Sequence, residues 1–145
     1  MKLEQEILIN QYGQGVVEIE QLVSIFKEFR NDDKRVFLNE ILFWFVIQSK
    51  PTKEDIELAI ITSKLKPTYT PCVLLKKGVE KYKLERIIEL PDNEIEKVFI
   101  LLLNLFKIAY NRRFEQEKNN PSKWWYWDLS DNQTVSTIIS KYSNR

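Results

Sequence analysis

Apolar residues recur along most of this chain at intervals of three and four positions, which is the spacing of one face of an α-helix. The pattern predicts a first short helix that ends near Gly13 and Gly15, followed by a second over residues 19–29. The apolar face of the second helix consists of Ile19, Leu22, Val23, Phe26 and Phe29.

Two further segments carry apolar residues on more than one side and are therefore predicted to form the centre of the core. The segment 35–48 is apolar around most of its circumference, through Phe37, Leu38, Ile41, Leu42, Trp44 and Phe45. The segment 92–117 forms the longest predicted helix. Its main stripe is Ile95, Val98, Phe99, Leu102, Phe106, Ala109 and Tyr110, and its second stripe is Leu101, Leu105 and Ile108.

Polar and proline residues mark the expected helix starts. Asn31 or Asp32 can cap the central segment, and Thr52 followed by Asp55 resembles a capping box. Thr70 stands as an N-cap before Pro71, which would be the first helical residue.

Short amphipathic segments complete the predicted fold, one around residues 84–88 and one over 135–142. No segment requires a strand. The fold class predicted for residues 1–145 is a single all-α domain, an irregular or orthogonal bundle of about seven or eight helices.

The composition argues against several kinds of catalytic and metal-binding site. The chain has no histidine, which is the commonest general base and metal ligand, and its single cysteine, Cys72, cannot form an intrachain disulfide. The acidic pairs Asp32-Asp33 and Glu54-Asp55 lie at predicted helix starts, where they stabilise the helix dipole. Without a glycine-rich phosphate loop or metal-ligand spacing, we expect no enzyme, no metal and no cofactor.

Charge and hydropathy favour a soluble protein of a reducing cytoplasm. The net charge of +1 argues against a dedicated nucleic-acid binder, and the longest apolar run, Ile41–Ile47, is far shorter than the roughly 20 residues of a membrane span. Residues 50–83 nevertheless carry eight lysines against four acidic residues. This stretch is either a solvated helix surface or a basic face for an acidic partner.

The connector Lys66–Pro71 is the first candidate site. Thr68 and Thr70 offer hydroxyls and Tyr69 offers a ring, close to a helix start that can hold an anion. The alternative is a rigid connector whose threonines cap a helix.

The second candidate site combines Arg112-Arg113 with the aromatic run Trp124-Trp125-Tyr126-Trp127. The arginines either complement the end of their own helix, with a pair such as Arg113 and Glu117, or stack on indole rings. Consecutive positions of any regular element point in different directions, so Trp124, Trp125 and Trp127 cannot all be buried against one surface. They therefore act as a latch over the core, as a contact surface for a partner, or as both.

Motifs from both candidate sites resemble those of a family of small bacterial proteins that is known only as a domain of unknown function. The matching elements, in chain order, are Ile7-Leu8-Ile9-Asn10-Gln11 with Gln14-Gly15, Lys66-Pro67-Thr68-Tyr69-Thr70-Pro71 with Val73-Leu74, Arg112-Arg113, and Trp124-Trp125. The resemblance spans about residues 5–128. It implies a small, bacterial, single-domain protein, and it assigns no activity and no functional residue.

The sequence thus favours a non-enzymatic interaction protein of the bacterial cytoplasm, with another protein as partner. An immunity protein that neutralises a cognate toxin is the most concrete form of this expectation. The alternative is a small-ligand-binding or regulatory helical module with a pocket lined by Tyr69, Arg112, Arg113 and the tryptophans. The sequence does not indicate an oligomeric state.

Overall fold

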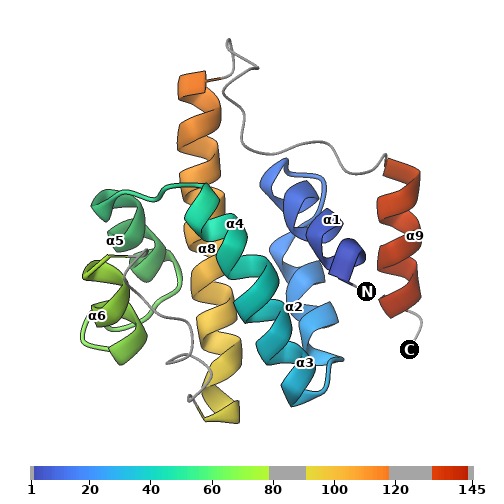
Figure 1. The fold of residues 1–145 in the computed structure, drawn as a ribbon, viewed down its shortest axis with the longest axis horizontal. Coiled ribbons are helices and arrows are strands. Elements are labelled where there is room, and N and C mark those ends of the chain that lie inside the picture. The colour runs from blue at the N-terminus through green and yellow to red at the C-terminus, as the bar shows by residue number, and fades with distance from the viewer. Residues whose placement is uncertain (1, 79–90, 118–131, 144–145) are drawn as a thin grey trace.

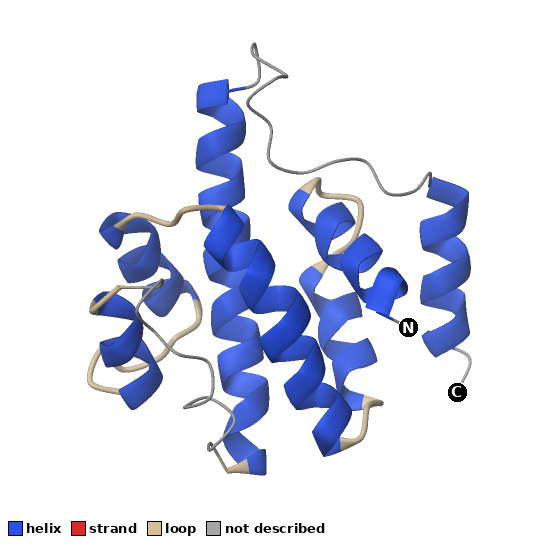
Figure 2. Ribbon diagram, in the orientation of Figure 1, coloured by secondary structure: helices blue, strands red, loops and turns tan. Residues whose placement is uncertain are grey.

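The computed structural model describes residues 2–78, 91–117 and 132–143, and within these ranges every regular element is helical (Figures 1 and 2). The all-α class predicted from the sequence is confirmed. The elements are α1 (Lys2–Gly13), α2 (Ile19–Lys27), α3 (Asn31–Val36), η1 (Phe37–Leu42), α4 (Phe43–Gln48), α5 (Lys53–Thr62), α6 (Thr70–Lys76), α8 (Asp92–Glu117) and α9 (Asn132–Ser143).

Helix α8 runs through the middle of the molecule, with α5 and α6 on one flank and α1, α2 and α9 on the other (Figure 1). Every residue of its predicted main stripe is buried, and so are Leu101 and Leu105 of the second stripe. Packing on two faces is what an apolar helix of this pattern requires. Its central position is therefore a direct consequence of the sequence.

A single rod leads from α3 through η1 into α4 and lies across α8. Its middle part, η1, is a π-helix, in which the Phe43 amide donates to the Leu38 carbonyl five residues back. Within this segment Phe37, Leu38, Ile41 and Leu42 are all buried. The η1 and α4 parts of the rod lie in the core as predicted, whereas α3 has no buried residue and Trp44 is about two-fifths exposed.

Aromatic rings join the rod, α2 and α8 at one point of the core. Phe26 and Phe99 stack with their centroids 3.8 Å apart, and the Phe37 ring meets Phe99 edge-on at 5.4 Å. All three side chains are fully buried. Such contacts add about 0.5–1.5 kcal/mol each beyond the burial of apolar area.

The predicted starts of α5 and α3 have different outcomes. The capping box of α5 is confirmed, since the Asp55 amide donates to Thr52 Oγ1 and the Thr52 amide donates to Asp55 Oδ2. The predicted cap of α3 is wrong: the N-cap is Arg30, and the Asn31 amide group donates to Asp92 Oδ2 at 2.8 Å. Asp92, which begins α8, also pairs with Arg35, so it joins the two helices.

The start of α6 differs from the prediction by one residue. Tyr69 occupies the N-cap and Thr70 is already helical, and no side chain caps this helix. Pro71 consequently stands at the second helical position, where the missing amide hydrogen is still without cost. The helix ends just before Gly78, whose φ of 131° an L side chain rarely adopts.

The end of α1 depends on α8. Lys107 Nζ donates to the carbonyls of Tyr12 at 2.6 Å and Gly13 at 3.2 Å, which supplies the positive charge that the last turn of α1 lacks. A Cβ at Gly13 would come within 3.0 Å of the Phe106 and Tyr110 rings. Glycine therefore allows α1 to approach α8 closely.

Among the described residues, no helix is both long enough and apolar enough to cross a membrane. The predicted segment around residues 84–88 lies outside the described residues.

Candidate functional site

Arg112 and Arg113 bind the connection between α4 and α5. Arg113 donates to the carbonyl of Gln48 at 2.6 Å, and Arg112 donates to the carbonyl of Lys50 at 3.0 Å. Lys50 has a φ of 49°, in the left-handed region that a lysine enters only at a cost of about 1–2 kcal/mol. The two guanidinium groups thus satisfy carbonyls where α4 ends and hold a strained turn in place.

Arg112 also forms an ion pair with Asp55 at the start of α5. Its Nε donates to Asp55 Oδ2 at 2.9 Å, and the Asp55 side chain is only 7% exposed. The same carboxylate completes the capping box with Thr52. One acidic side chain therefore joins the start of α5 to the last turns of α8.

These contacts revise the role expected for the arginines. The pair of Arg113 with Glu117 is present at 3.2 Å, as predicted. The carbonyls that the arginines bind, however, belong to the end of α4 and the turn after it rather than to their own helix. Arg113 is buried and Arg112 is partly exposed. This part of the candidate site is well suited to holding two helices together.

Tyr69 lies at the other end of α8. Its ring is partly exposed, but its hydroxyl oxygen is buried and has no hydrogen-bond partner in the described part of the chain. Burial raises the pKa of Tyr69 to about 12, with smaller contributions from Glu94 and Cys72. Thr68 and Thr70 on either side are exposed.

The structure does not bring the two candidate sites together. Glu94, whose charge acts on Tyr69, is in the first turn of α8, whereas Arg112 is 18 positions later. At 1.5 Å per residue this separates the two ends by about 27 Å. A single small pocket cannot contain both Tyr69 and the arginines.

Trp124, Trp125 and Trp127 lie outside the described residues. Their assignment as a latch or as a contact surface remains a prediction, and so does the stacking of Arg112 or Arg113 on their rings.

An exposed apolar pair on α5 is a feature that we did not predict from the sequence. Leu58 is 49% exposed and Ile61 is 72% exposed, whereas Ile56, Ala59 and Ile60 on the other side of the helix are buried. The signal was present, because Leu58 and Ile61 are three positions apart and fall outside the buried stripe. Exposed lysines surround the pair in sequence: Lys50, Lys53, Lys64, Lys66, Lys76 and Lys77.

Groups with catalytic or metal-binding potential are few in the described ranges. No cluster of three or more acidic or cysteine side chains is arranged to hold a metal ion there. Cys72 is fully buried, and burial raises the pKa of its thiol. The thiolate, which is the reactive form, is therefore disfavoured in the folded chain.

Sequence comparison now gives the class to which this helical bundle belongs. The chain is a member of a family of unknown function, DUF5958, whose profile matches residues 4–128. No curated protein and no solved structure shows a significant match. Helix α9 lies beyond the matched residues.

Proposed function

We propose that this protein is a non-enzymatic interaction protein that binds a partner protein through α5. The observation that supports the proposal is the exposed pair Leu58 and Ile61. Two large aliphatic side chains on the same face of a helix expose apolar area that a partner would remove from water, at roughly 25 cal/mol per Å².

The charge around this pair indicates the kind of partner. From residue 50 to residue 77 the exposed charged side chains are six lysines and two glutamates, Glu54 and Glu57. The excess of exposed lysines in this stretch favours an acidic partner, because complementary electrostatic potentials accelerate association and disfavour other surfaces. The basic segment noted in the sequence thereby acquires a specific role.

An immunity protein of a bacterial cytoplasm is the concrete form of this proposal. Such a protein needs a rigid surface and no catalytic group. The arginine contacts that hold α5 against α8 would keep the surface rigid. The partner would then be a toxin with an acidic face.

The test compares two faces of the folded chain in the source organism. A photo-reactive amino acid at position 61 is expected to crosslink one discrete protein, whereas the same group at Val36, which is 47% exposed on α3, should not.

For the immunity role, genes adjacent to this one are expressed in a susceptible host. The chain should restore growth against one of them, and Leu58→Ser/Ile61→Ser should not.

The interaction proposal fails if position 61 crosslinks no more protein than position 36. The immunity proposal fails if no neighbouring product inhibits growth, or if the double variant protects as well as the original chain. Both substitutions lie on the surface, so circular dichroism should show an unchanged fold.

A further inference from the structure

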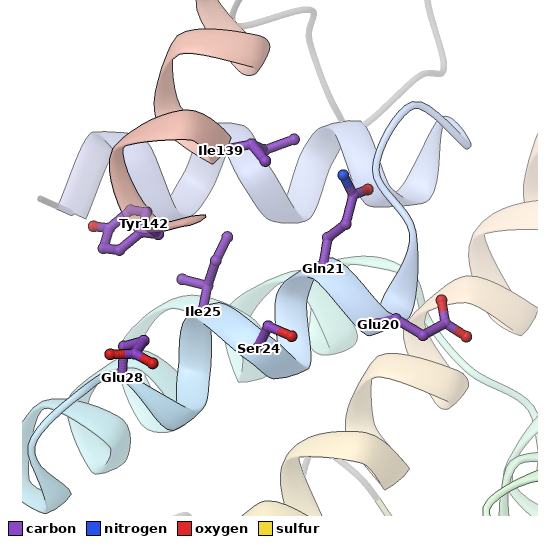
Figure 3. Close-up of a pocket in the computed structure, with 7 residues that line it drawn as sticks. All are labelled: Glu20, Gln21, Ser24, Ile25, Glu28, Ile139 and Tyr142. Carbon is purple, nitrogen blue, oxygen red and sulfur yellow. The ribbon is translucent and has the colours of Figure 1, made fainter. Parts of the chain in front are cut away.

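A groove of about 400 Å³ lies between α2 and α9, on the flank opposite α5 (Figures 1 and 3). Its apolar part consists of Ile25 from α2, which points toward α9, together with Ile139 and Tyr142 from α9 (Figure 3). Four polar side chains complete the lining: Glu20, Gln21 and Ser24 of α2, and Glu28 at its C-cap. The volume is near the lower end of the range of ligand-binding clefts.

Helix α9 is held in place beside the groove by contacts with Glu4 of α1 and with Phe29. Tyr142 donates to Glu4 Oε2 at 3.3 Å, and its ring meets Phe29 edge-on at 5.7 Å. Ile138 is buried against the core. The apolar wall that α9 contributes therefore belongs to an ordered, packed helix.

The two carboxylates of the groove have no counter-ion within the described ranges. Glu20 of α2 and Glu28 at the C-cap of this helix are exposed, eight positions and thus about 12 Å apart. The described lysines of the two helices are engaged elsewhere, since Lys27 pairs with Glu96 at 3.5 Å and Lys141 pairs with Glu4 at 3.1 Å. The groove consequently has an apolar floor and an uncompensated negative charge at each end.

We propose that this groove binds a basic segment of a partner protein. An apolar side chain of that segment would pack on Ile139, which is partly exposed between the buried Ile25 and Tyr142, and lysine or arginine side chains on either side of it would reach Glu20 and Glu28. A helix with basic residues eight positions apart matches the separation of the two carboxylates. Negative charge beside an apolar floor discriminates against acidic segments of similar shape.

This site is independent of the contact proposed for α5. The two surfaces lie on opposite flanks of α8 (Figure 1). The exposed charges of residues 50–77 are mostly basic, whereas the charged residues of the groove are acidic. One wall of the groove is formed by α9, which lies beyond residue 128, where the match to the family ends. We therefore expect basic-segment binding to distinguish this chain from a member of the family that lacks α9.

The test uses the full chain labelled with nitrogen-15 and a synthetic amphipathic helical peptide. The peptide carries two lysines eight positions apart and leucines between them on the same face; a matched peptide has glutamates in place of the lysines. The lysine peptide should shift amide signals of residues 20–28 and 138–142. Glu20→Gln/Glu28→Gln should weaken binding at least tenfold, and so should high salt, because exposed charges are screened.

Two control variants separate this site from other surfaces. Glu57→Gln removes an exposed carboxylate of α5, and Leu58→Ser/Ile61→Ser alters the other proposed contact; neither should change binding of the lysine peptide. The proposal is overturned if the glutamate peptide binds equally well, if the shifts fall outside α2 and α9, or if the Glu20/Glu28 variant binds like the original chain. A loss of peptide binding in the Leu58/Ile61 variant would assign the peptide to α5 instead.

Discussion

The two flanks of α8 are attached in different ways. On one flank α5 is joined to α8 through a carboxylate that is almost completely buried, in the pair Asp55–Arg112. On the other flank α9 is joined to α1 through Glu4 and Lys141, whose side chains are 30% and 51% exposed. Ion pairs have very different consequences in these two settings, because a buried charge that loses its partner cannot be solvated.

The largest expected effect follows from removing the buried carboxylate. Asp55→Ala deletes both the ion pair and the capping box of α5, and should lower the free energy of unfolding by about 3 kcal/mol. Urea denaturation measures the change. Glu54→Ala, one position earlier and exposed, is the matched control and should cost about 0.5 kcal/mol or less. Equal effects of the two substitutions would show that burial does not decide the difference.

A smaller change in the free energy of unfolding, with the opposite sign, is expected on the same flank. Tyr69→Phe removes a buried hydroxyl that has no described partner, so it should raise stability by about 1 kcal/mol. Tyr12→Phe is the control, because the Tyr12 hydroxyl donates to the Leu103 carbonyl at 3.3 Å, and its loss should lower stability. Destabilisation by Tyr69→Phe would mean that this hydroxyl has a partner in the folded chain.

The stability of the chain at alkaline pH gives a second test of the burial of the Tyr69 hydroxyl. Burial raises the pKa of Tyr69 from 10.0 to about 12, so the folded chain holds its proton more tightly than the unfolded chain. The resulting stabilisation is complete below pH 10 and is lost as pH rises toward 12. Melting temperatures measured across this window should fall less steeply for Tyr69→Phe than for the original chain. Parallel curves would contradict this assignment.

On the opposite flank, the expected loss of stability is smaller. Glu4→Gln removes the ion pair with Lys141 and weakens the contact with Tyr142, at a cost of about 0.5 kcal/mol. Amide hydrogen exchange should show roughly twofold faster exchange confined to α9. Glu6→Gln is the control on the same helix. Unchanged protection of α9 after Glu4→Gln would assign its attachment to Ile138 and the Tyr142 ring alone.

The reactivity of Cys72 tests the same comparison without a change at Cys72 itself, because this residue lies on the α5–α6 flank. In the native chain iodoacetamide should label Cys72 extremely slowly, because the side chain is buried and burial raises the pKa of its thiol. Asp55→Ala should accelerate labelling, whereas Glu4→Gln should leave the rate unchanged. Equal acceleration by both would indicate that the two flanks open together.

Features that depend on local periodicity were predicted from the sequence. The bounds and buried faces of α8 follow from its apolar spacing, and the Thr52–Asp55 capping box needs only neighbouring residues. Capping by Asn31 failed because Asp92, 61 positions away, binds that side chain instead. The partners of Arg112 and Arg113 are similarly distant in sequence, so no local pattern could reveal them.

The groove between α2 and α9 could not be predicted from the sequence for the same reason, that its residues are distant in the chain. Its two walls come from residues 20–28 and 139–142, more than 100 positions apart, and each wall alone is an ordinary amphipathic helix. Only the packing of α9 against α1 and α2 places Ile139 opposite Ile25. The exposed pair on α5 was accessible from the sequence, since its phase on the helix already placed it away from the buried stripe.

The dependence of α1 on Lys107 has a consequence for biosynthesis. The two residues that meet at this helix end, Tyr12 and Lys107, are 95 positions apart. At about 5–20 residues per second, translation delivers Lys107 on the order of 5–20 s after Tyr12. During that interval α1 has neither its C-terminal cation nor the rings of Phe106 and Tyr110 to pack against. Helix α1 is thus synthesised well before the residues of α8 that complete its environment, so its final packing follows the synthesis of α8.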